Sequence, residues 1–444
     1  MSTVLGFATI AALLVLLLSN RVTAVVPLIA VPVVAAAVAG FSPGEIAGFV
    51  TTGLNGVAAT AAMFVFAILY FGVMRDAGLF DPVIRRILRF GGDDPVTVCL
   101  ATLLLASVAH LDGAGATTFL ITVPALLPLY DALGMRRSVL AALTGLGAGV
   151  MNLLPWGGPT ARAAATIGVD ANQIWTPLIP AQIAGLLACG AIAYWLGLRE
   201  RARLGAGSRV TVTVPVAPGH VEDAPGGRGE DAGGRRTWLT AVNAALTLAL
   251  IGVLVSGVLP PHLVFMIATA VALPLNHRGM KAQTDCVNAH AQGAILMAST
   301  LLAAGVFLGV MEESGMIEGM AGALTGAIPD QVGPLLPVLV GLLGVPMSLL
   351  FGPDAYYFAV LPVINGVGAG FGIEPLVLAQ ASVIGQETVG FPISPLTGSF
   401  FLLTGLSGVS IGSHIRFLLP LAWLVSVVML AVAVLTGVVP LWAG

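Results

Sequence analysis

Charge is scarce in this sequence. Only 9% of the 444 residues are Asp, Glu, Lys or Arg, whereas roughly 25% are charged in a typical soluble domain. Hydrophobic residues make up 57%, and apolar runs of about 20 residues, long enough to cross about 30 Å of hydrocarbon, recur from end to end. An ordinary soluble globule is therefore excluded. The chain is predicted to be an all-α polytopic membrane protein, embedded in a lipid bilayer and without a nucleic-acid partner.

Cysteine is scarce as well. The three cysteines, Cys99, Cys189 and Cys286, are far apart and show no C-x-x-C spacing, so neither a disulfide framework nor a zinc site is predicted. We expect buried, inert thiols. The N-terminal run also lacks a basic start and an A-x-A cleavage site, so we expect it to be retained as a first membrane helix.

The few basic residues are grouped, and their positions predict the topology. Short loops rich in Lys and Arg stay on the cytoplasmic side of a membrane. Threading the apolar runs through these groups leaves every Lys and Arg except Arg162 on the cytoplasmic side. Both termini are then outside. The Gly-, Pro- and Arg-rich segment 199–237 is predicted to be a flexible cytoplasmic linker between two halves.

Each half is predicted to follow the same plan of three helices, an amphipathic arm, a re-entrant hairpin, a broken helix and a last helix. In the first half, 1–198, these segments are 3–19, 24–40, 57–74, 75–95, 97–130, 138–165 and 176–196. In the second half, 238–444, they are 238–258, 262–275, 286–311, 312–328, 334–371, 373–410 and 417–440. Two full spans would also satisfy the topology at 97–130, but the interruption DGAG leaves arms of only about 15 residues, which favours re-entry from the cytoplasm. For the arm 75–95, which we place at the inner interface, an ordinary surface loop is the alternative.

Three pairs of segments in the two halves resemble each other in the same order. FGVMRDAGLFDPVIRR matches FLGVMEESGMIEGMAG, LDGAGATTFLITVP matches FGPDAYYFAVLP, and GVMNLLPWGGPT matches GQETVGFPISPLT. The predicted topology gives the two copies opposite orientations. Inverted repeats with broken helices in corresponding positions are typical of secondary transporters with a binding site near the membrane midplane.

Polar side chains gather at these breaks, where unpaired backbone groups must face protein, water or a ligand. Helix N-termini suit carboxylates, unwound carbonyls suit cations, and a guanidinium can hold a carboxylate in two hydrogen bonds. The predicted substrate-binding residues are Asp112, Gly113, Ala114, Gly115, Thr117, Thr118, Asn152, Gly157, Thr160, Arg162, Gly352, Asp354, Tyr356, Gln386, Thr388, Ser394 and Thr397. Candidates for carrying a proton are Asp112, Asp354, Glu387 and His110.

Several of these residues have purely structural alternatives. Asp112 and Asp354 are suited to capping the second arms of their hairpins. Arg162 can pair with an internal acid, and His110 can be a hydrogen-bonded core histidine. An intramembrane aspartic protease is disfavoured, because its two aspartates must lie within hydrogen-bond reach, whereas Asp112 and Asp354 are on tips that enter from opposite faces.

The segments HLDGAGATTFLITVPALLPLYDALGMRR, NLLPWGGPTARAA, FGPDAYYFAVLPVI and GQETVGFPISPLTGSFFLL resemble the citrate-metal:proton symporter family of bacteria, within the wider ion transporter superfamily. The resemblance covers nearly the whole chain except 205–236. It implies a plasma-membrane importer of citrate complexed with a divalent metal and driven by protons. Related members imply a homodimer whose transport part moves as an elevator against a scaffold. The Ser-Asn-Thr signatures of sodium-coupled relatives are absent, which disfavours sodium coupling.

The hypothesis from the sequence is therefore a transporter, not an enzyme, with no permanently bound cofactor. Arg162 and the helix ends would hold citrate, while Asp112, Asp354 and Glu387 would approach the metal carried with it. Glu387 or one of the aspartates would be protonated during the cycle. A gluconate-type carrier or a cation/proton antiporter on the same scaffold is the alternative.

Overall fold

The fold is described from a computed structural model, which covers residues 2–19, 21–205 and 232–443. Within these ranges all regular secondary structure is helical. Among the described residues, seven helices are long and apolar enough to cross a membrane, or eight if the bent pair Pro375–Ile393 and Gly398–Ser407 counts as one span. The predicted all-α membrane fold is confirmed at this level.

In the first half of the chain the helices are α1 (Ser2–Leu18), α2 (Val25–Val38), α3 (Pro43–Asp76), α4 (Asp81–Gly91), α5 (Pro95–Ala109), the 3-10 turn η1 (His110–Asp112), α6 (Gly115–Leu133), α7 (Arg137–Met151), α8 (Gly158–Ile167) and α9 (Ala171–Leu204). Within the range 75–95, where an arm is predicted, the first two residues end α3 and a helix covers only Asp81–Gly91. Residues 206–231 of the predicted linker lie outside the described residues, and its first residues, through 204, continue α9.

In the second half the helices are α10 (Ala232–Ser256), α11 (Pro261–Asn276), α12 (Met280–Glu313), α13 (Met316–Thr325), the 3-10 turn η2 (Gly333–Leu335), α14 (Leu336–Met347), α15 (Pro353–Ala355), the π-helical η3 (Tyr356–Val360), α16 (Leu361–Ala369), α17 (Pro375–Ile384), the π-helical η4 (Gly385–Val389), the 3-10 turn η5 (Phe391–Ile393), α18 (Gly398–Ser407) and α19 (Ile411–Leu435). The breaks fall within the two segments predicted to be interrupted, 334–371 and 373–410.

Helix α3 begins well before the predicted start at 57. A capping box starts it: Ser42 Oγ accepts a hydrogen bond from Glu45 N, and the Glu45 carboxylate accepts one from Ser42 N. The glycines that follow serve helix packing, because a Cβ on Gly53 would lie only 1.9 Å from Gly305 O of α12. Small residues let two membrane helices approach closely. The sequence pattern alone makes such glycines look like a helix boundary.

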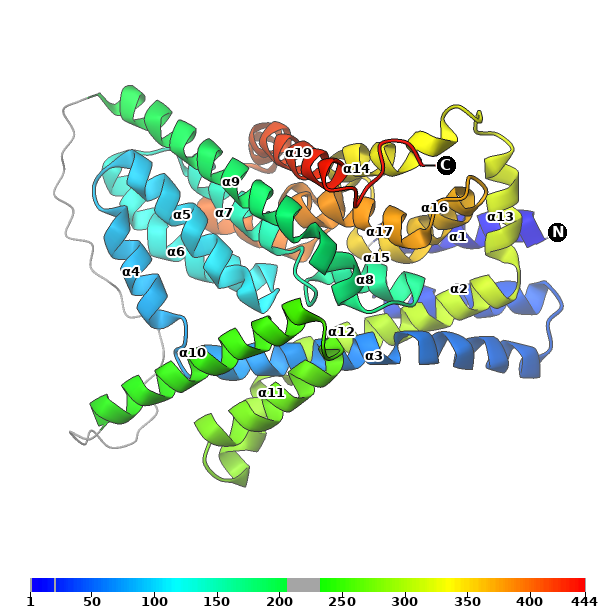
Figure 1. Cartoon of the computed structure of the whole chain (residues 1–444), viewed down its shortest axis with the longest axis horizontal. Coiled ribbons are helices and arrows are strands. Elements are labelled where there is room, and N and C mark those ends of the chain that lie inside the picture. Colours follow the sequence, from blue (N-terminus) through cyan, green and yellow to red (C-terminus); the bar gives the residue numbers. More distant parts are fainter. Residues whose placement is uncertain (1, 20, 206–231, 444) are drawn as a thin grey trace.

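The molecule has two groups of helices (Figure 1). Helix α3 lies beside α11 and α12, and α2 also packs on α12. The other group contains α5 to α7, α9, α14 and α17 to α19. Helix α4 lies near one end of the long axis, whereas α13, packed against α1, lies toward the other end with both termini. The breaks predicted to form the site lie in the second group.

Candidate functional site

Four interrupted segments of the chain meet in the structure. We call residues 110–114 the first tip, 152–157 the first gap, 348–352 the second tip and 385–397 the second gap. They separate α5 from α6, α7 from α8, α14 from α15, and α17 from α18. The contacts described below join all four into one polar region within an apolar bundle.

The first gap contacts the first tip, and helix α8, which follows the gap, contacts α15, which follows the second tip. Trp156 Nε1 donates a hydrogen bond to the carbonyl oxygen of Leu111 at 2.8 Å. Arg162 Nε donates to Asp354 Oδ1 at 2.7 Å. The Arg162 side chain is 8% exposed and that of Asp354 is 23% exposed. The structure therefore brings Arg162 and Asp354 together as a largely buried ion pair across the two halves of the chain.

Asn152 joins the first tip to the second gap. Its Nδ2 donates a hydrogen bond to the carbonyl oxygen of Glu387 at 2.9 Å, and its Oδ1 lies 3.3 Å from His110 Nε2. His110 Nδ1 lies 2.8 Å from Thr118 Oγ1, and the imidazole stacks on the ring of Phe391. Both nitrogens of this buried histidine thus have partners, which is the geometry of a hydrogen-bonded core histidine.

Glu387 differs from every other acid at the breaks. It is 1% exposed, and neither of its carboxyl oxygens has a hydrogen-bond partner. Among the described residues it is the one non-glycine with positive φ, at φ 52° and ψ 11°. The buried hydroxyl of Ser394 also lacks a partner, and η4, which carries Glu387, packs against α8, which carries Arg162. Backbone strain and an unsatisfied buried group in one residue are typical of a functional site.

Asp112 lies in a different environment. Its Oδ1 accepts a hydrogen bond from Ala114 N at 2.8 Å, and its Oδ2 lies 3.6 Å from Arg75 Nη1 of α3. The capping contact, which is the structural alternative to a binding role for Asp112, is thus present. Asp112, Asp354 and Glu387 do not form a ready-made group of metal ligands among the described residues. Any metal held here has to bring most of its ligands with it.

Some of the remaining predicted residues form hydrogen bonds to the backbone at the breaks, and others form them to side chains. Three threonines donate to backbone carbonyl oxygens: Thr160 Oγ1 to Leu153, Thr397 Oγ1 to Phe391 and Ser394, and Thr388 Oγ1 to Gln386. Thr117 Oγ1 accepts a hydrogen bond from Arg75 Nη1. The Tyr356 hydroxyl pairs with Ser382, and Gln386 Nε2 donates to Phe351 O. At the first tip, Gly113 has a φ of 73°. Gly115, which begins α6, lies against Phe391. At the second tip, a Cβ added to Gly352 would have Leu396 Cβ as its nearest neighbour.

Ser348 and Tyr357 are not among the predicted substrate-binding residues, yet both contact the second gap. Ser348 Oγ accepts a hydrogen bond from Glu387 N at 2.9 Å and lies 3.2 Å from Gln386 Oε1. The Tyr357 hydroxyl donates to Gln386 O at 2.7 Å. Ser348 is the first residue of the second tip and the first hydroxyl after the apolar helix α14, and this position is the signal in the sequence that could have identified it.

Gly157 should be intolerant of substitution. A Cβ there would lie 2.1 Å from the carbonyl oxygen of Asn152, so Gly157→Ala forces the first gap apart. We expect a loss of about 1–3 kcal/mol in unfolding free energy, seen as a lower Tm in detergent. Gly190→Ala in α9 is the matched control, because a Cβ there meets nothing within 4 Å. Equal melting curves for both variants would show that the gap is not tightly packed.

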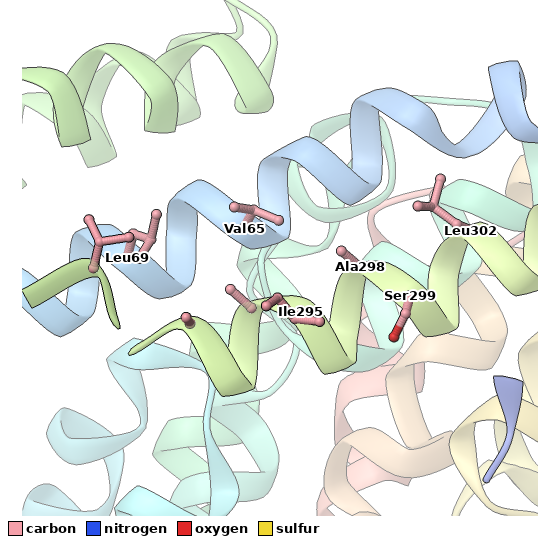
Figure 2. A pocket seen from close by; sticks show the side chains of 9 residues that line it. Val65, Leu69, Ile295, Ala298, Ser299 and Leu302 are labelled. Atoms are coloured by element: carbon pink, nitrogen blue, oxygen red, sulfur yellow. The ribbon is translucent and has the colours of Figure 1, made fainter. Parts of the chain in front are cut away.

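A surface groove between α3 and α12 does not belong to this region (Figure 2). Its volume is about 420 Å³, and it is lined by Val65, Leu69, Val287, Ala291, Ala294, Ile295, Ala298, Ser299 and Leu302. Ser299 is the one polar side chain among them. A small charged ligand would find no counter-charge there, so the groove is not a candidate for an anion site.

The chain is similar to known transporters over nearly its full length. A family model described as citrate transporter (CitMHS) matches residues 4–385. A citrate transporter of Bacillus subtilis is 41% identical over 439 residues, covering 99% of this chain and 100% of the relative. A Mg(2+)/citrate complex secondary transporter of the same organism is 39% identical over 439 residues, covering 99% of both chains.

Two solved structures share the fold. The YdaH transporter of Alcanivorax borkumensis matches with a TM-score of 0.60 and 19% identity, over 89% of this chain and 90% of that one. MtrF of Neisseria gonorrhoeae matches with a TM-score of 0.61 and 16% identity, over 90% of this chain and 86% of that one. Both likenesses show a shared fold. The family match and the two Bacillus relatives establish that this chain belongs to the citrate transporter family, whose members are secondary transporters and not enzymes.

Proposed function

We propose that this protein imports citrate as a complex with a divalent metal ion, in symport with protons. The observation that carries the proposal is the buried, unpartnered carboxyl of Glu387 in η4, which packs against α8, the helix that carries Arg162 and its ion pair with Asp354. A carboxyl that can carry a proton, that of Glu387, and a guanidinium that can bind an anion, that of Arg162, would then lie in one region. The relative named as a Mg(2+)/citrate complex transporter supports the same substrate class.

Charge neutralisation explains why metal and protons would travel with citrate. Citrate carries about three negative charges at neutral pH, so a divalent ion reduces the complex to about one negative charge. Moving that charge inward opposes the membrane potential by about 2.3 kcal/mol per 100 mV. One proton neutralises the complex, and a second makes inward transport favourable.

The Arg162–Asp354 pair provides a way to exchange protein contacts for substrate contacts. In the structure, the Asp354 carboxylate accepts a hydrogen bond from Arg162 Nε. A citrate carboxylate has the same chemistry and would replace it, which frees Asp354 to approach the bound metal. The guanidinium stays paired throughout, so the site avoids an uncompensated buried charge.

The movement and placement in the membrane follow from the same proposal. The helices around α3 and α12 would form a fixed scaffold, and the group with the four breaks would move across the membrane as an elevator, with two copies forming a homodimer. In the bacterial plasma membrane, α4 would lie at the cytoplasmic interface, and both termini, with α13, would lie outside.

Uptake by proteoliposomes tests substrate and coupling together. Labelled citrate is offered with each of several divalent metals or with chelator, with and without an inward-directed pH gradient. We expect uptake that requires a metal and increases with the gradient. Citrate uptake that persists in chelator would contradict transport as a metal complex. Transport of gluconate would favour the gluconate-type carrier, and transport of metal alone would favour the cation/proton antiporter. Unchanged uptake and pH dependence in both Asp112→Asn and Asp354→Asn would contradict their assigned roles.

A further inference from the structure

A second group of ionisable side chains lies where the end of α3 meets the beginning of α12. Asp76 Oδ2 is 2.8 Å from His290 Nε2 and 3.9 Å from Cys286 Sγ. One potential ligand atom from each of the three residues lies within 4.8 Å of the others, and no other group of this kind occurs among the described residues. The citrate site described above uses none of the three.

The helix geometry places this group in a prepared position. Cys286 and His290 are one turn apart on α12, so their side chains project from the same face. Gly72, one turn before Asp76 on α3, makes room for the imidazole, because a Cβ on Gly72 would lie 2.5 Å from His290 Cδ2. The His290 side chain is 9% exposed, whereas Asp76 is 37% exposed and provides a path to solvent.

We propose that Asp76, Cys286 and His290 bind a transition-metal ion of the Zn²⁺ or Co²⁺ type, with water as the fourth ligand. Three protein ligands and one open position are typical of a non-structural zinc site. A thiolate and an imidazole favour such ions over Mg²⁺ and Ca²⁺, which prefer oxygen ligands. This site is therefore separate from the cargo site, where the metal would be held by carboxylates. Binding releases the thiol proton to solvent.

Arg75 connects this metal site to the first tip. Its Nη2 lies 3.4 Å from His290 Nδ1, and its Nη1 lies 3.3 Å from Thr117 Oγ1 and 3.6 Å from Asp112 Oδ2. Without metal, Nδ1 accepts from Arg75 while Nε2–H donates to Asp76. A metal on Nε2 moves the imidazole proton to Nδ1, where it faces the Arg75 donor. Metal binding therefore weakens the Arg75–His290 contact and leaves Arg75 to the first tip.

Cobalt spectroscopy on the purified full-length protein in detergent tests the proposal. Titration with Co²⁺ is expected to give a thiolate-to-cobalt charge-transfer band at one equivalent per chain, which Zn²⁺ abolishes and a large excess of Mg²⁺ leaves in place. Cys286→Ser should remove the band. Cys189→Ser, which removes another buried thiol, should retain it.

Gly72→Ala keeps all three ligand side chains but displaces the imidazole, and it covers the case in which Cys286→Ser fails to fold. We expect it to weaken Co²⁺ binding by roughly 10- to 100-fold, as loss of a supporting contact does at other metal sites. Absence of the band in the unmodified protein, its survival in Cys286→Ser, or unchanged affinity in Gly72→Ala would each overturn the proposal. None of these results depends on citrate transport.

Discussion

Arg162→Gln is expected to reduce metal-citrate affinity by roughly 10- to 150-fold, because a charge-assisted hydrogen bond contributes about 1.5–3 kcal/mol. The same change leaves the Asp354 carboxylate without its partner, and removing one member of a buried pair costs about 3–5 kcal/mol. Initial uptake rates over a range of citrate concentrations, at fixed excess metal, measure the change as a rise in KM.

Two variants make this result specific. Arg137→Gln removes a cation from an exposed pair with Asp131, which is worth at most about 1 kcal/mol, and should transport normally. Arg162→Lys keeps the charge without the fork geometry and should retain part of the affinity. Citrate affinity in Arg162→Gln equal to that of the unmodified protein would mean that Arg162 serves only to pair with Asp354.

Glu387→Gln is expected to uncouple transport from protons. Glutamine has nearly the same volume, so it can occupy the buried position, but it takes up no proton. Uptake driven by a pH gradient should be lost, while exchange of labelled for unlabelled metal-citrate across the membrane, which needs no net proton movement, should continue. Both modes can be measured on the same proteoliposomes.

Glu374→Gln is the matched control for this change. Glu374 lies at the start of α17, in the same interrupted segment as Glu387, but its side chain is exposed. The substitution should leave both gradient-driven uptake and exchange intact. Gradient-driven uptake by Glu387→Gln at the normal rate would move the proton-carrying role to Asp112 or Asp354.

The positions of the breaks were predictable from the sequence because their causes are local. Glycine and proline disfavour the interior of a helix, and the structure has breaks at DGAG and FGPD, where they cluster with an aspartate. The bounds of α3 were predicted wrongly for a related reason. Gly53 looks like an interruption but packs against Gly305 of a helix far along the chain, and nothing in the local pattern distinguishes the two uses.

The partners of the polar groups could not be predicted, since they are separated by long stretches of chain. Arg162 and Asp354 are 192 residues apart, and Asp76 and His290 are 214 apart. Spacing rules for metal ligands detect only neighbours in sequence, so they missed a group contributed by two helices. The sequence did mark Arg162 as exceptional, because it is the one basic residue outside the segments predicted to be cytoplasmic.

Two hydrogen bonds at the breaks, from Asn152 to Glu387 and from Arg162 to Asp354, join the two halves of the chain. Because synthesis runs from the N-terminus, the first half reaches the membrane with Asn152 and Arg162 still lacking these partners. Unsatisfied polar groups are costly in hydrocarbon. The nascent first half is therefore an unfinished intermediate that needs the second half to complete it, and it is the stage at which membrane quality control would act on truncated chains.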